Sequence, residues 1–180
     1  MAARRFRVDA RTTGVLWWYS ASSVLLGPPA ESYVRGGPVA LGSMTLFLHP
    51  DGRLLDARAA GTVSRDEAPV QVAGLVATCV AAVAAASRAS PRALWAIASD
   101  SLANRVLWAG GGAAEAEALA ADPRFPAPRY VEVAGQRVVR RVSCCLVYES
   151  PGQQKCVSCP RQRPDDRLRR LRAALGGVDA

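Results

Sequence analysis

Hydrophobic and polar positions in the first third of the chain predict a helix and then a hairpin. From residue 12 to residue 26 the larger apolar side chains recur at helical spacing, with Thr12 or Thr13 as the cap and a Gly-Pro-Pro stop. Residues 38–48 alternate as in an extended strand, residues 49–52 read His-Pro-Asp-Gly, and residues 53–60 alternate again. This order predicts two antiparallel strands joined by a tight turn.

The middle of the chain has a helical pattern. Ser64 and Glu67 have the spacing of a capping box ahead of the uncharged run 70–86. Pro91 favours the start of a second helix, which three glycines at 110–112 end, and an Ala/Glu helix is expected over 113–121. The run 70–86 barely reaches the length of a membrane span and is mostly alanine, so we expect a buried helix and no transmembrane segment.

The last third returns to strands before a final helix. Residues 130–133 and 137–142 alternate about Ala-Gly-Gln and predict a second hairpin, and Asp165 or Asp166 caps a basic helix. Strands, helices and strands without a repeating βαβ unit predict an α+β fold, with helices packed with short antiparallel hairpins. We expect an α+β core over 1–135 and a small cysteine-rich C-terminal module over 136–180.

Charge and composition limit the kinds of binding partner and the cellular location that we expect. The 180 residues carry a net charge of +8, and residues 124–180 hold eleven Arg, one Lys and only five carboxylates. Such a region attracts nucleic acid, a membrane surface or an anionic small molecule. Aromatic residues are not interleaved with these arginines, so nucleic-acid binding is not expected. No secretory signal is visible, which predicts a cytoplasmic protein, with peripheral membrane contact left open.

Four of the five cysteines lie within sixteen residues: Cys144, Cys145, Cys156 and Cys159. In the cytosol thiols stay reduced, so a cluster of this kind indicates a metal site. Ser-Pro-Gly at 150–152 can reverse the chain and bring the two halves together. Four thiolates suit either a 2Fe–2S cluster or a structural zinc ion, and the spacing alone supports both equally.

The run Arg140-Arg141-Val142-Ser143-Cys144-Cys145-Leu146-Val147-Tyr148, followed by Cys156-Val157-Ser158-Cys159-Pro160, resembles the C-terminal signature of FhuF-like ferric-siderophore reductases. The shared pattern is Cys-Cys-x10-Cys-x2-Cys, and it covers about residues 138–162. Weaker similarity extends to residues 95–102 and to residues 16–19.

The resemblance implies a 2Fe–2S cluster held by all four cysteines, with no catalytic residue beyond these ligands. It also implies an oxidoreductase that reduces siderophore-bound ferric iron by one electron, with a ferric siderophore as substrate and a separate electron donor. Four thiolates give the cluster a negative charge, so nearby cations raise its potential or attract substrate. Arg140, Arg141, Lys155 and Arg161 are the candidates for that role.

Two rival functions remain at this point. A non-enzymatic 2Fe–2S electron carrier or sensor would bind the same cluster without turnover, and a zinc-stabilised interaction or nucleic-acid-binding protein would hold one zinc ion instead. Cys79 is expected to be a small buried hydrophobe in its helix, and His49 an exposed turn residue.

Overall fold

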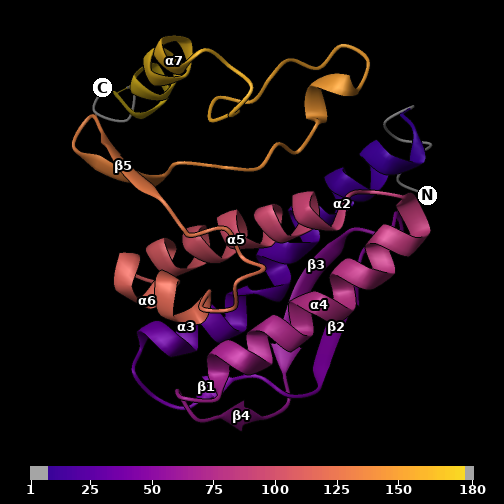
Figure 1. Cartoon of the computed structure of the whole chain (residues 1–180), viewed down its shortest axis with the longest axis vertical. Coiled ribbons are helices and arrows are strands. Elements are labelled where there is room, and N and C mark those ends of the chain that lie inside the picture. The colour runs from indigo at the N-terminus through magenta and orange to yellow at the C-terminus, as the bar shows by residue number, and fades with distance from the viewer. Residues whose placement is uncertain (1–7, 177–180) are drawn as a thin grey trace.

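The computed structural model describes residues 8–176, which form helices and short antiparallel strand pairs (Figure 1). The α+β prediction is confirmed. In chain order the elements are α2 (Ala10–Leu25), α3 (Gly27–Val34), β1 (Val39–Ala40), β2 (Met44–Leu48), β3 (Leu54–Ala59), β4 (Thr62–Val63), α4 (Ala68–Ser87), α5 (Pro91–Trp108), α6 (Ala113–Leu119), β5 (Tyr130–Val133), β6 (Gln136–Val139), a 3-10 turn η1 (Val147–Glu149) and α7 (Pro164–Gly176).

Helix α5 is the centre of the molecule. Every residue from 97 to 103 is buried, because α2, α3, α4 and α6 pack around it. Leu94, Ile97 and Leu102 are completely enclosed, and Trp18 of α2 donates its indole N–H to the carbonyl of Leu94 at 2.8 Å. A helix buried on several sides needs apolar residues around most of its circumference, so a polar residue inside it calls for partners.

A glycine lets two of the surrounding helices approach closely. A Cβ built on Gly14, in the second turn of α2, would lie 2.2 Å from Oγ of Ser87 at the end of α4. Glycine is unfavourable inside a helix, and its use here is explained by this contact. The contact holds the end of α4 beside the first turns of α2.

The strands form three two-stranded antiparallel pairs among the described residues. The hairpin β2–β3, with Met44 opposite Ala59, and the hairpin β5–β6, with Tyr130 opposite Val139, confirm the two predicted hairpins. The third pair joins β1 to β4 around the base of β2–β3 and had no signal in the sequence beyond alternation.

Helix boundaries differ from the predicted ones at several caps. Asp9 caps α2 by accepting the amide N–H of Thr12 at 2.6 Å, so the cap lies earlier than Thr12 or Thr13. The Gly-Pro-Pro sequence ends α2 and also begins α3, because proline is well tolerated in the first turn of a helix. Ser64 and Glu67 bond to each other as in a capping box, yet α4 starts after Glu67.

Within the described residues, α4 is the one helix with the length and apolar composition of a membrane span. In this structure Val72, Val76 and Val80 face the core against α2 and α5, while Val70 on the other side is 73% exposed. The expected buried helix is therefore buried along one face.

The C-terminal part forms a layer of its own on the helical core. Figure 1 shows β5–β6, the loop that follows and α7 lying along the side of α2 and α5 that faces away from the hairpin β2–β3. The predicted boundary at residue 135 falls in the turn of β5–β6, and the two-part division stays a prediction. The leucines of α7 are not buried; the helix lies on β5.

The backbone conformation of Arg88 is expected to lower the stability of the fold. It follows α4 with φ of +60°, in the left-handed region, and its amide N–H bonds to the carbonyl of Ala84 at 2.8 Å. Glycine is the usual residue at this position. We expect Arg88→Gly to raise the free energy of unfolding by about 1 kcal/mol, measured by thermal denaturation. An equal or lower stability would contradict the assignment of left-handed strain.

Candidate metal centre

The four clustered cysteines lie on one loop between β6 and α7. Leu146, with φ of +61°, turns the chain directly after Cys145, and η1 follows. The loop reverses through Gly152, whose φ is +73°. The Cys-x-x-Cys half is a closed turn, since the amide N–H of Cys159 bonds to the carbonyl of Cys156 at 3.1 Å. These turns bring the two halves face to face, as the Ser-Pro-Gly sequence predicted.

The thiols meet as two pairs, each with one cysteine from each half. Cys144 and Cys159 have their sulfur atoms 3.8 Å apart. Cys145 and Cys156 lie close enough for the thiol of each to shift the pKa of the other. Cys145 and Cys159 are buried, and the other two are partly exposed. Neighbours in an extended strand point to opposite faces, so the left-handed turn at Leu146 accompanies the bend that lets both adjacent cysteines face the second half.

The environment favours thiolate at one of the paired cysteines. The hydrogen bond from Cys156, the amide N–H of Val147 and the nearby Arg141 together lower the pKa of Cys145 to about 5, although burial opposes them. Burial is the main cause that raises the pKa of Cys144. The pKa of Cys156 is raised because it shares its proton with Cys145. Metal is held by thiolates, so the cysteines that keep their protons release them when the site takes up metal.

Arg141 is a buried cation beside these thiols. Its side chain is 4% exposed, and its Nη1 lies 3.6 Å from the sulfur of Cys156. The guanidinium also covers the ring of Tyr19 at 4.6 Å from its centroid. Its Nε is buried without a hydrogen-bond partner among the described residues. A buried donor without an acceptor is rare, and here the nearest charged group is the carboxylate of Asp100, 3.6 Å away.

Asp100 of α5 compensates Arg141 and holds the cysteine segment in place. Its carboxylate accepts the amide N–H groups of Val142 and Ser143 at 3.1 and 2.9 Å and the hydroxyl of Ser143 at 2.5 Å. Oδ2 lies 3.6 Å from Nε of Arg141, which makes an ion pair that is too long for a hydrogen bond. Burial raises the pKa of Asp100, while its hydrogen bonds and Arg141 act in the opposite direction.

A second anchor ties the loop to α2. Glu149 of η1 accepts the hydroxyl of Thr12 at 2.6 Å and forms an ion pair with Arg11 at 3.4 Å. Thr12 is buried at this contact. The loop is therefore attached to the core on both sides of the adjacent cysteines, through α5 before them and through α2 after them.

Of the four basic residues nominated from the sequence, the structure brings one to the thiols. Arg141 contacts Cys156, whereas Arg140 is exposed. Lys155 donates to the carbonyl of Arg161 at 3.0 Å, and Arg161 donates to the hydroxyl of Tyr148 at 2.8 Å. Cys79 is half-buried in α4, and His49 lies in the β2–β3 turn beside Asp51.

Sequence reasoning missed Asp100 and Tyr19, the two partners of Arg141 from the helical core. Asp100 lies in the segment 95–102 and Tyr19 in the segment 16–19, to which the weaker similarity to FhuF-like proteins extends. That similarity implies no role for either residue. The available signal was positional, because Asp100 falls within an otherwise apolar helix. A carboxylate there predicts a buried cation, but the sequence does not say which of the many arginines supplies it.

The donor set fits a 2Fe–2S cluster. Each iron of such a cluster takes two thiolates, and the chain presents two pairs of thiols. Among residues 8–176, no group of three or more His, Cys, Asp or Glu side chains is arranged to hold a single metal ion. Nη1 of Arg141, 3.6 Å from the sulfur of Cys156, supplies a hydrogen-bond donor of the kind that the sulfurs of such clusters use.

Comparison with known proteins agrees with this geometry. Residues 141–161 match the family model of the FhuF 2Fe-2S C-terminal domain. No curated protein and no solved structure matches the chain. The matched segment begins at Arg141 and includes all four clustered cysteines. The cysteine-rich C-terminal region therefore carries this domain, and its cofactor is a 2Fe–2S cluster.

Proposed function

We propose that the protein is a reductase for chelated ferric iron, of the ferric-siderophore type, and that Cys144, Cys145, Cys156 and Cys159 are the ligands of its 2Fe–2S cluster. The pairing of the thiols carries this proposal, because one cysteine of each pair comes from each half of the loop. When bound, the cluster supplies single electrons. The match to residues 141–161 supports the cofactor, and the reductase activity is the further step.

One electron suffices for the chemistry. Siderophore oxygens are hard donors that hold ferric iron far more tightly than ferrous iron. The ferric iron gains one electron and becomes ferrous, a separate one-electron donor loses that electron, and no bond of the chelator breaks. In this reaction the chain holds the cofactor and admits the chelate. The proposed location of the protein is the cytoplasm.

Arg141 and Asp100 are the residues through which the chain would adjust the reduction potential of the site. Reduction adds a negative charge to a site that already has four thiolates, and the buried guanidinium beside Cys156 stabilises that charge. Asp100 holds Arg141 and the amide groups of residues 142 and 143, so it positions the cation without touching the sulfurs.

The test is a single-turnover reduction. The anaerobic protein with its cluster is reduced by dithionite, freed of excess reductant and mixed with ferric chelates, and a ferrous-specific chromogenic chelator records the product. We expect about one ferrous ion per chain, with a rate that saturates as chelate concentration rises. Reoxidation without saturation, at similar rates for unrelated chelates, would instead identify an electron carrier.

A further inference from the structure

A second feature adjoins the cysteine loop: a hollow of about 570 Å³ between the loop and the ends of three helical segments. Its size is within the range of small-molecule pockets. Cys144 forms part of its wall, so the hollow reaches a thiol of the proposed cluster site. Its lining combines apolar side chains, two serines and four arginines, and the last come from Arg11, Arg88, Arg92 and Arg161.

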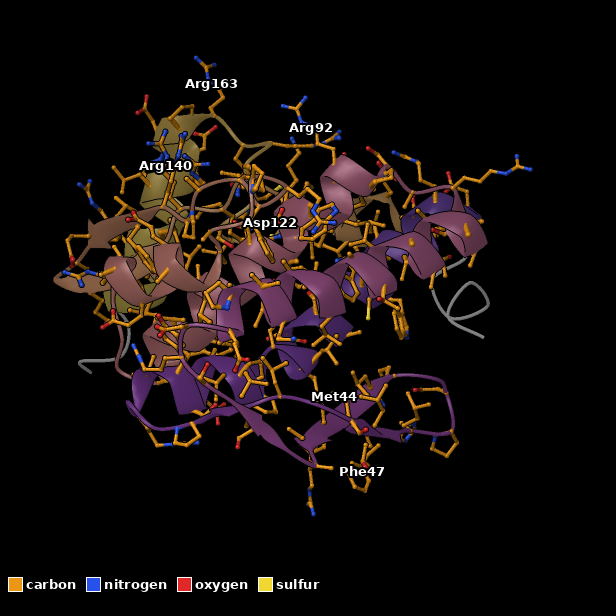
Figure 2. The ribbon with its side chains drawn as sticks, turned by 60° about the horizontal axis from the view of Figure 1, so that its bottom comes forward. Met44, Phe47, Arg92, Asp122, Arg140 and Arg163 are labelled. Atoms are coloured by element: carbon orange, nitrogen blue, oxygen red, sulfur yellow. The ribbon has the colours of Figure 1, made fainter. Side chains whose placement is uncertain are left out.

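The four arginines converge from separate parts of the chain. Arg11 belongs to α2, Arg88 to the connection after α4, Arg92 to the first turn of α5 and Arg161 to the cysteine loop. Figure 2 shows Arg92 on the same edge of the molecule as Arg163 of the C-terminal layer. A run of like charges on one helix is ordinarily a solvated face. Like charges that four segments bring to one cavity repel one another, and a bound anion would relieve that repulsion.

These charges are poorly compensated. Arg11 has Glu149 at 3.4 Å. In the part of the chain that the structure describes, no carboxylate lies within ion-pair distance of Arg88, Arg92 or Arg161. The N-terminus of α5, which has no side-chain cap, opens onto the same hollow through Ser90 and Arg92 and adds a positive end.

Arg88 gives a separate indication. It occupies the left-handed position that ends α4, where glycine is the usual residue. An arginine there carries backbone strain, and strain of this kind is retained mainly where a side chain serves a function. The backbone at this point is held by the close approach of Ser87 to Gly14, so the Arg88 side chain starts from a fixed position at the rim of the hollow.

The floor of the hollow differs from its rim. Val15, Ala96 and Leu146 are apolar residues of the same lining as Cys144 and are more buried than the exposed Arg88 and Arg92. A ligand that fits both parts has flat apolar groups and a concentrated negative charge. An arginine guanidinium stacks on aromatic rings and donates paired hydrogen bonds to anionic oxygens.

From this arrangement we propose that the hollow between α2, α5 and the cysteine loop binds an anionic metal chelate of the catecholate type, held by Arg88, Arg92 and Arg161 with its metal end toward Cys144. This inference rests on the proposed reductase function and names the charge class of its substrate. Chelates with a net positive charge are excluded by the same arginines.

Binding is tested with redox-inert gallium(III) chelates, which keeps it separate from turnover. The protein with its cluster is titrated calorimetrically with gallium(III) tris-catecholate and with the gallium(III) complex of a linear trihydroxamate that bears a free amine and a net positive charge. We expect at least tenfold tighter binding of the tris-catecholate, weakening as salt rises.

The variants locate the site. The double substitution Arg88→Gln with Arg92→Gln is expected to weaken tris-catecholate binding roughly 30- to 100-fold, and Arg88→Lys with Arg92→Lys to recover part of that loss. Arg35→Gln, which removes one exposed arginine after α3, is the control and should leave binding unchanged. Unaltered visible and far-UV spectra show that each variant retains its cluster and fold.

Two outcomes overturn the inference: equal binding of the two chelates, or unchanged binding in the double glutamine variant. If ferric chelates are reduced but the variants bind normally, this pocket is wrong and the reductase function stands. If the gallium tris-catecholate binds as expected and its ferric counterpart is never reduced, the pocket stands and the reductase function is wrong.

Discussion

Replacing Cys156 by serine is expected to remove the cluster. Wild-type protein purified without oxygen should hold about two iron and two sulfide ions per chain and show thiolate-to-iron absorption bands. Serine is a harder ligand that keeps its proton near neutral pH, and Cys156 is half of one thiol pair. We expect iron content below about a fifth of wild type and no visible bands, measured by metal and sulfide analysis and absorption spectroscopy.

A matched control is available in the same chain. Cys79→Ser changes a thiol in the same way, but Cys79 lies in α4, outside the clustered cysteines. This variant should retain its iron, its sulfide and its absorption bands. A colourless wild-type protein with one zinc ion per chain would overturn the assignment and make the zinc-stabilised rival the better description.

Breaking the Asp100–Arg141 pair is expected to give the largest loss of stability. In Asp100→Asn the buried guanidinium loses its countercharge, and one amide oxygen must replace two carboxylate oxygens that accept from residues 142 and 143. Removal of one member of a buried ion pair costs about 3–5 kcal/mol. For a chain of this size we expect the melting temperature to fall by about 6–20 °C, measured by circular dichroism under nitrogen.

Two further variants separate charge from general disruption. Asp122→Asn removes a partly exposed carboxylate that pairs with Arg124 at 2.8 Å, and should change the melting temperature by at most a few degrees. Asp100→Asn combined with Arg141→Met removes both charges and should be less damaging than the sum of its parts. If Asp100→Asn behaves like Asp122→Asn, Asp100 does not anchor the cysteine loop.

A large part of the local structure was readable from the sequence because it depends on local interactions. The two hairpins follow from alternation about turn residues, and α5 follows from Pro91 and helical spacing. The caps were less predictable. Asp9, rather than Thr12 or Thr13, caps α2, since several polar residues near a helix start can accept the free amide groups.

The tertiary structure decided which charges serve the candidate site. The sequence placed Arg140, Arg141, Lys155 and Arg161 near the cysteines with equal weight, yet only Arg141 contacts a thiol, because Asp100 and Tyr19 hold it beneath the loop. The arginines of the hollow are up to 150 positions apart, from Arg11 to Arg161. Such residues are brought together by helix packing, which local sequence patterns do not predict.

The sequence by itself determined the chemistry of the site. Four cysteines at this spacing limit the ligand set to thiolates, and the match to residues 141–161 identifies the cofactor that such a set holds. Only the tertiary structure decided how the thiols pair and which side chains surround them. The reason is physical: ligand identity belongs to residue type, whereas pairing, burial and charge compensation depend on contacts between distant segments, above all between α5 and the cysteine loop.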